Sequence, residues 1–215
     1  QGNCRVNVTG TSSSCIYAHG GTTNYTSQGT NDLLSATMSG SISSDDRITS
    51  AAISAVAGSI SITGGASVSS DGLGITTSTG TDASASGSGG KFTYTARTVD
   101  DALTVTSYYG TAMYIEGSAK IDGTATITSR ALNDTQYTFV EVDKDTPPIY
   151  DALRLNNGGL TTSGYFTVNH TGLGAAVYIK SGSFKAESGT VDITNDMAKF
   201  KYTESAGNIS YDGVY

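Results

Sequence analysis

Residues 111–128 read TAMYIEGSAKIDGTATIT, and the spacing within them decides the fold class. Ile115, Ile121 and Ile127 recur every six residues, and two polar corners, each containing a glycine, separate them. Inside each piece, apolar and polar residues alternate. Alternation with a period of two is typical of β-strands, and glycine allows tight turns between them. The stretch therefore predicts short β-strands joined by glycine corners.

The same pattern recurs at residues 175–194, which read AAVYIKSGSFKAESGTVDIT. Four dipeptides, Tyr-Ile, Gly-Ser, Gly-Thr and Ile-Thr, occur in the same order in both copies. A fainter copy lies at residues 59–76, where Ile62 and Val68 flank a pair of glycines. The intervals between the copies are unequal, which indicates a duplicated module of several strands and not a strict repeat array.

The composition indicates an all-β protein with few charges. Only 14% of the 215 residues are charged and the formal net charge is -7, whereas Ser and Thr together number 61. Hydroxyl groups can replace charges on exposed strand faces, and β-branched Thr favours strands over helices. The sequence offers no basic patch for a nucleic acid or an anionic membrane surface. No stretch reaches the about 18 apolar residues of a membrane span, so we expect no membrane insertion.

Composition divides the chain into three segments. Residues 1–30 are polar and form an N-terminal segment. Residues 31–90 form a first β module, which ends in the Ser- and Gly-rich stretch STGTDASASGSGG at 78–90. Such a stretch is typical of a loop or linker, so the candidate boundary lies near residue 90. Residues 91–215 form the main β module, which contains the duplicated strand motif.

Residues 45–57, DDRITSAAISAVA, are the one candidate for a short helix. Two aspartates suit the positive end of a helix dipole, and Gly58 is a suitable stop. The rival interpretation is a strand that buries Ile53 and Val56. The sequence leaves both interpretations open.

Short strands that turn through glycine corners can stack as the rungs of a β-solenoid, which is the fold we expect. The segments GSAKIDGTATITS and SGSFKAESGTVDITN resemble the rungs of right-handed β-helix surface proteins, such as adhesins and pectin-lyase-like domains. The resemblance covers residues 59–195 with gaps, and it implies a β-helix. A β-sandwich of jelly-roll or Greek-key type, as in a pilin-like subunit, is the alternative.

Cys4 and Cys15 are the two cysteines of the chain. Their even number, their close spacing and the polar composition predict a disulfide that closes the N-terminal loop. Two free thiols or a metal pair are the alternatives, but zinc needs more ligands and His19 is the one nearby imidazole. The chain begins with Gln1, which we interpret as a processed product whose signal peptide has been removed.

Five sequons for N-linked glycosylation add to this extracellular pattern. They are a mild excess over the roughly three that chance would produce, and they predict glycans on exposed positions. The acceptor residues are Asn7, Asn24, Asn133, Asn169 and Asn208. We therefore expect an extracellular or cell-surface protein.

Glu141, Asp143 and Asp145 alternate with other residues, so a strand would place all three carboxylates on one face. Such a trio could bind Ca²⁺ through hard oxygen ligands. The competing interpretation is a solvated strand end that runs into the Pro147-Pro148 turn. Calcium is the one cofactor that the sequence suggests.

The sequence contains no catalytic constellation. It lacks the motifs of serine hydrolases, zinc proteases and phosphate-binding loops. A triad needs a base, and the two histidines are His19 and His170, the second inside a sequon and expected at an exposed corner. The acidic pair Asp100-Asp101, close to Arg97, is interpreted as a solvated turn. We therefore expect no enzymatic activity.

The threonine alternation of residues 124–128 raises the question of an ice-binding face. That function needs a flat array of aligned threonine pairs on successive rungs. Neither Ile75-Thr76-Thr77 nor Asp192-Ile193-Thr194 keeps the pattern. Comparison of these three stretches of the chain therefore argues against an ice-binding face.

The function that these observations favour is a structural subunit of a filament or surface appendage. Residues 4–9 and 208–215 both alternate and could pair with the open edge of a neighbouring copy, which is β-strand addition. The apolar contacts of this homopolymer would be Val6, Val8, Ile209 and Tyr211. The alternatives are a carbohydrate-binding or carbohydrate-cleaving β-helix and a viral fibre module.

Overall fold

The computed structural model describes residues 2–10, 13–39, 51–79, 89–108, 110–130, 151–171, 174–196, 201–203 and 210–212. These residues form seventeen β-strands, and no helix occurs among them. Fifteen strands belong to one continuous sheet system, in which the strands pair in parallel, and the other two form an antiparallel pair. The described chain is therefore all-β, as the sequence predicts.

Strand pairing divides the large system into three parallel sheets. Sheet 1 contains β1 (Cys4–Thr9), β4 (Leu33–Ser39), β7 (Gly65–Ser70), β10 (Ala102–Ser107) and β13 (Thr124–Arg130). Sheet 2 contains β2 (Ile16–His19), β5 (Ala51–Val56), β8 (Leu73–Ser78) and β11 (Met113–Ile115). Sheet 3 contains β3 (Thr22–Thr26), β6 (Ser59–Thr63), β9 (Lys91–Thr95) and β12 (Ser118–Asp122). The long strands β14 (Leu153–Thr171) and β15 (Val177–Asp196) contribute to all three sheets, and β16 (Lys201–Thr203) pairs with β17 (Ser210–Asp212).

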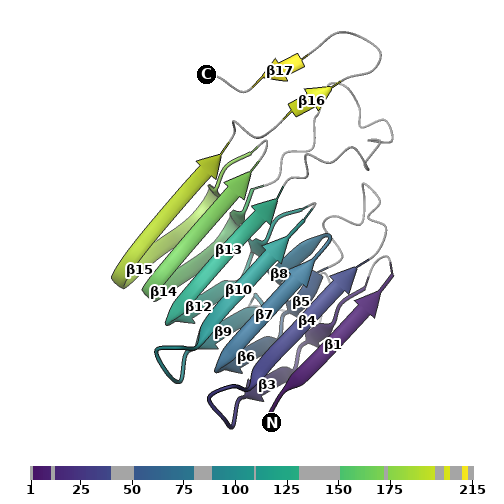
Figure 1. The fold of residues 1–215 in the computed structure, drawn as a ribbon, viewed down its shortest axis with the longest axis vertical. Helices are drawn as coiled ribbons and strands as arrows, with labels where there is room; N and C mark the ends of the chain where they lie inside the picture. The colour runs from purple at the N-terminus through teal and green to yellow at the C-terminus, as the bar shows by residue number, and fades with distance from the viewer. Residues whose placement is uncertain are drawn as a thin grey trace.

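The chain passes through sheets 1, 2 and 3 in order and then begins the next circuit, or rung, beside the previous one. Figure 1 shows the strands of sheet 1 side by side, from β1 near the N-terminus to β15. This arrangement confirms the expected β-solenoid, since a jelly-roll or Greek-key sandwich would require antiparallel pairs. The sheets also continue across residue 90, because β6 pairs with β9.

The two clear sequence copies occupy equivalent positions two rungs apart. Ile115 pairs with Leu155, and Leu155 pairs with Ile179 on the next rung. The fainter copy aligns differently, because Ile62 pairs with Tyr94 and Tyr94 pairs with Ile121. The strand that contains Ile62 therefore stacks with the second half of the 111–128 stretch, at Ile121, and not with the first half, at Ile115.

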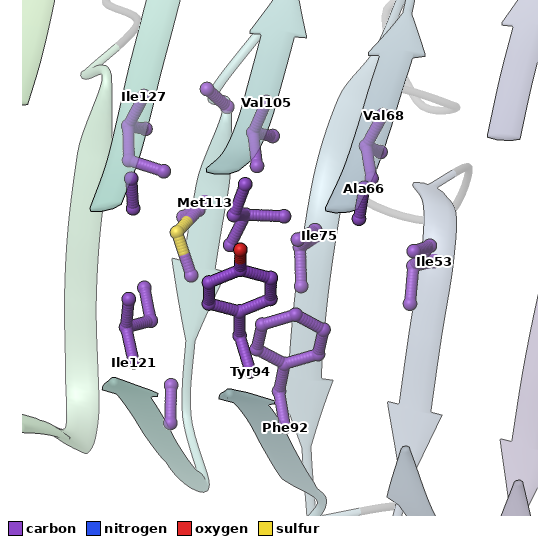
Figure 2. Packing of buried hydrophobic residues seen from close by; sticks show 14 of the residues in the cluster. Ile53, Ala66, Val68, Ile75, Phe92, Tyr94, Val105, Met113, Ile121 and Ile127 are labelled. Atoms are coloured by element: carbon purple, nitrogen blue, oxygen red, sulfur yellow. The ribbon is translucent and has the colours of Figure 1, made fainter. Parts of the chain in front are cut away.

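Inward-facing residues of successive rungs stack on one another and form the core. The central file of sheet 1 contains Ala36, Val68, Val105, Ile127 and Val168, each at most 1% exposed. Figure 2 shows Val68, Val105 and Ile127 of this file together with buried residues from the other two sheets. Each rung buries the apolar face of the next, so the stack forms one continuous core.

The helix suggested for residues 45–57 is wrong where the structure describes it. Residues 51–56 form β5, and residues 45–50 lie outside the described ranges. Five of the six residues of β5 are buried. A strand that is covered on both faces carries small or apolar residues on both, so it loses the period-two signal and imitates a helix.

Candidate functional surfaces

The outer face of sheet 1 carries two parallel files of polar side chains, all of them hydroxyls except Asn169. The alternation that buries the apolar file turns the residues between them outward. The first file contains Ser35, Ser67, Thr104, Thr126 and Thr167, and the second contains Thr37, Ser69, Thr106, Thr128 and Asn169. We call these ten residues the hydroxyl array.

The pairing register makes the hydroxyl array regular. Thr126 pairs with Thr104 on one side and with Thr167 on the other, and the pairings from β4 to β14 contain no register shift. Paired strands lie about 4.8 Å apart, and two residues along a strand span about 6.7 Å. Five rungs therefore give a two-file lattice about 19 Å long.

Charged residues flank the hydroxyl array but do not enter it. Arg5 pairs with Ser35 at one end, and Asp192 pairs with Thr167 at the other. The outer face of sheet 3 differs, because it carries exposed charges at Lys91, Lys120 and Lys185. Arg130 is exposed on the same outer face, two residues beyond Thr128, so neutrality is a property of the two files and not of the whole face.

The side chains of the array are accessible and laterally supported. Thr104 is exposed, and the other nine are half-buried between their neighbours. Thr is also stiff at χ1 because its Cβ is branched. Hydroxyl and methyl groups are thus held in a repeating pattern that faces solvent.

Comparison of residues 124–128 with residues 75–77 could not reveal the array, because the two stretches lie in different sheets. Ile75-Thr76-Thr77 belongs to β8 in sheet 2, so it does not stack on Thr126. The partners of Thr126 lie 22 residues before it and 41 residues after it. These unequal intervals conceal the alignment in the sequence. Asp192-Ile193-Thr194 does pair with β14, and there Asp192 ends the neutral file.

A second polar group lies on the outer side of sheet 2. The Asn156 side-chain amide donates hydrogen bonds of 2.8 Å to the Tyr114 hydroxyl and 2.9 Å to Glu116 Oε1. The Tyr114 hydroxyl donates to the same carboxylate at 3.0 Å. Burial raises the pKa of Tyr114, and the Glu116 carboxylate raises it further. One rung on, Arg154 lies 4.7 Å from the ring centroid of Tyr178. These groups bind one another across three rungs, so we assign them to stabilising the stack.

The last rung leaves inward-facing apolar side chains uncovered. Among the described strands, β15 pairs with β14 alone. Ile179 and Ile193 are in register with buried residues of β14, yet each remains 47% exposed. At the opposite end, Val6 and Val8 lie on β1 and are half-buried. Both ends of the solenoid therefore present incomplete apolar layers.

The predicted disulfide is wrong, since Cys4 and Cys15 are both unpaired. The Cys15 thiol donates a hydrogen bond of 3.1 Å to the Thr37 carbonyl and interacts with the backbone of Val8. Val8 lies four residues beyond Cys4 on β1, which is about 13 Å along the strand. A disulfide needs Cα atoms within about 7 Å, so the extended strand keeps the two thiols apart. Burial raises the pKa of Cys15.

Three of the five predicted glycosylation sites lie in the described ranges. Asn7 on β1 and Asn24 on β3 are exposed, whereas Asn169 is half-buried in the hydroxyl array. Asn133 and Asn208 lie outside the described residues. Glycan attachment at all five stays a prediction.

The expectation that His170 lies at an exposed corner is wrong, because this residue is 1% exposed. It continues a file of buried serines on the inner side of sheet 1, formed by Ser70, Ser107 and Ser129. Ser107 donates a hydrogen bond of 2.6 Å to the Gly72 carbonyl. The buried serine hydroxyls of this file therefore stabilise the connections between sheets 1 and 2 from the inner side.

Asp101 also differs from the solvated turn that the sequence indicates, since it is 6% exposed. Its carboxylate accepts hydrogen bonds from the backbone N–H groups of Arg97 at 2.9 Å and Thr98 at 2.8 Å. Asp32 does the same for the backbone N–H groups of Gln28 and Gly29. Each carboxylate therefore closes a connection from sheet 3 to sheet 1.

The remaining predicted site residues give no described site. Glu141, Asp143, Asp145 and Ile209 lie outside the described ranges, so Ca²⁺ binding there stays a prediction. Tyr211 lies on β17 and pairs with Tyr202 of β16. Within the described ranges, no three His, Cys, Asp or Glu side chains are grouped as metal ligands. The same ranges include no helix with the length and apolarity needed to cross a bilayer.

Comparison with family models, with curated proteins and with solved structures found no match to this chain. The resemblance to adhesins and pectin-lyase-like domains therefore stays a prediction about relationship, while the solenoid architecture rests on the strand pairing itself.

Proposed function

We propose that the protein is an extracellular structural subunit that assembles end to end into a filament. The observation that supports this most directly is the uncovered last rung, where Ile179 and Ile193 are each 47% exposed. Every earlier rung has its apolar face covered by the next. The first rung of a second copy would cover the last rung in the same way.

Unpaired strand edges at both ends supply the hydrogen bonds for such a contact. Among the described strands, β1 pairs with β4 alone and β15 pairs with β14 alone. Free N–H and C=O groups along an edge strand are a template for pairing with another chain. The two ends are different surfaces, so the contact is heterologous and repeats into a fibre.

This proposal changes one of the two strand segments that the sequence-based hypothesis assigned to the contact. That hypothesis assigned strand pairing between copies to residues 4–9 and 208–215, whereas Ser210–Asp212 pairs with Lys201–Thr203 within the chain. We propose instead that β15 meets β1, with Val6 and Val8 on the receiving side. Low charge and the exposed sequons at Asn7 and Asn24 support the extracellular setting, in which glycans would occupy outward positions.

The test is a charge placed on the uncovered inner side of the last rung. In Ile193→Glu, a carboxylate would have to be buried at the contact, so we expect the concentration needed for assembly to rise about tenfold or more. Thr194→Glu is the matched control, because Thr194 is exposed on the opposite side of the same strand. Negative-stain microscopy and sedimentation measure the filaments.

A wild-type protein that stays monomeric at high concentration would overturn the proposal. Deletion of residues 208–215 separates the two routes to assembly. We expect filaments to persist without this segment. Loss of the filaments would mean that the C-terminal segment pairs with the neighbouring copy, as the sequence-based hypothesis held.

A further inference from the structure

We propose that the hydroxyl array on the outer face of sheet 1 is an ice-binding surface. Its ligand is a layer of ordered water that is continuous with the lattice of an ice crystal. This inference does not depend on assembly, because the array lies on the side of the solenoid and not at its ends.

The first argument is geometric. A crystal presents water oxygens at fixed intervals in two dimensions, so its binding partner must repeat in two dimensions as well. The array repeats about every 4.8 Å across the rungs and about every 6.7 Å along each strand. The interval across the rungs is on the scale of second-neighbour water oxygens in ice, and the interval along a strand is on the scale of the longer repeat of the ice lattice. Unshifted pairing from β4 to β14 keeps the pattern in phase over five rungs.

The second argument concerns the chemistry of the side chains. Nine of the ten array residues carry a hydroxyl, which, like water, can both donate and accept hydrogen bonds. The six threonines each add a methyl group, which favours ordered water between the hydroxyls; they are Thr37, Thr104, Thr106, Thr126, Thr128 and Thr167. Their branched Cβ limits χ1, so little side-chain entropy is lost when the crystal surface forms.

The third argument is the neutrality of the two files. A charged side chain orients a tight hydration shell around itself and resists transfer into another environment. The array excludes charge across five rungs, whereas the outer face of sheet 3 carries Lys91, Lys120 and Lys185. Charge on this side of the solenoid is confined to the margins of the array, at Arg5, Arg130 and Asp192, so the two files suit a neutral ligand.

The competing occupant is a flat crystalline polysaccharide such as chitin or cellulose. Sugar rings stack on aromatic side chains, and none of the ten array residues is aromatic. Tyr165 is 66% exposed on the same outer face, two residues before Thr167, but it lies at the margin of the array and outside the two files. We therefore commit to ice, and the polysaccharide becomes an outcome of the test.

The experiment compares three single substitutions with the wild-type chain. Thr126→Tyr places a bulky ring in the middle of the array, and Thr104→Tyr does so at its exposed position. Thr93→Tyr is the matched control, since Thr93 is half-buried on the outer face of sheet 3. Fluorescently labelled protein is tested for incorporation into a growing ice hemisphere and for inhibition of ice recrystallisation. Thermal unfolding confirms that each variant is folded.

We expect the wild type and Thr93→Tyr to enter the ice equally. Thr126→Tyr and Thr104→Tyr should need about tenfold more protein for the same inhibition, which corresponds to about 1.4 kcal/mol of lost adsorption. Exclusion of the wild type from ice would overturn the inference. An equal loss of inhibition in Thr93→Tyr would also overturn it. So would wild-type binding to chitin or cellulose that Thr126→Tyr abolishes, if the ice assays show no activity.

Discussion

Gly164 lies so close to Gly123 of the preceding rung that a Cβ at position 164 would come within 2.6 Å of the Gly123 carbonyl oxygen. Both glycines have positive φ, 98° at Gly164 and 121° at Gly123. They form the corner between sheets 3 and 1, where the hydroxyl array begins. The backbones therefore approach as closely as they do because neither residue has a side chain.

Gly164→Ala should destabilise the protein by about 2 kcal/mol or more, because a left-handed conformation alone costs a side chain about 1–2 kcal/mol. The close approach to Gly123 adds to that cost. Gly159→Ala is the control, since its Cβ would meet only Ser183 Oγ at 3.6 Å. Urea unfolding should separate the two variants, and equal midpoints would contradict the corner model.

Ile127→Ala should cost about 3 kcal/mol, the usual penalty for a cavity in a closed core. Ile127 is 0% exposed in the middle of its file. Ile193 stands at the end of the same file and is 47% exposed, so Ile193→Ala should cost the monomer less than about 1 kcal/mol. Unfolding at a concentration too low for assembly measures both. A larger effect at Ile193 would mean that the last rung is covered.

Reducing agent should leave the melting temperature unchanged, because Cys4 and Cys15 are free thiols. A disulfide across a loop of this size would add about 3 kcal/mol, so its reduction would be visible. Thiol titration in denaturant without reductant should find both cysteines. In the folded protein, Cys15 should react slowly near neutral pH, since burial raises its pKa and depletes the thiolate.

Asp32 should make a part of the stability depend on pH. Hydrogen bonds from the backbone N–H groups of Gly29 and Gln28 lower the pKa of Asp32 in the folded protein. Its contribution is therefore present above the unfolded value of about 3.9 and is lost as the pH falls through the folded pKa. Asp32→Asn should be less stable than the wild type at neutral pH, and the difference should shrink in acid. Urea midpoints measured across this range check the trend, and a constant difference would contradict it.

The strands were largely predictable because one face of most of them is buried and the other is not. Period-two alternation identified Ile121 and Ile127 as inward residues, and the copies that end at Ile127 and Ile193 do stack in one file. The signal failed at Ala51–Val56, where both faces are covered. It also failed for Cys4 and Cys15, because proximity in sequence says little about distance along an extended strand.

The hydroxyl array could not be found from the sequence, although its residues are conspicuous. Stacking is decided by which strands become neighbours, and the connections between them vary in length. Thr126 therefore has partners at unequal distances on its two sides, at Thr104 and Thr167. A comparison at a fixed interval reaches a strand of another sheet. Only the pairing register brings the matching residues together.

The stacking of each rung on its immediate neighbours has a further consequence. Contacts within a file depend on the layers immediately before and after, so an added or deleted layer leaves the rest of the column as it was. Each such change would alter the reach of the molecule by about 4.8 Å. Duplication or loss of the gene segment that encodes one rung is therefore enough to change the length of the solenoid.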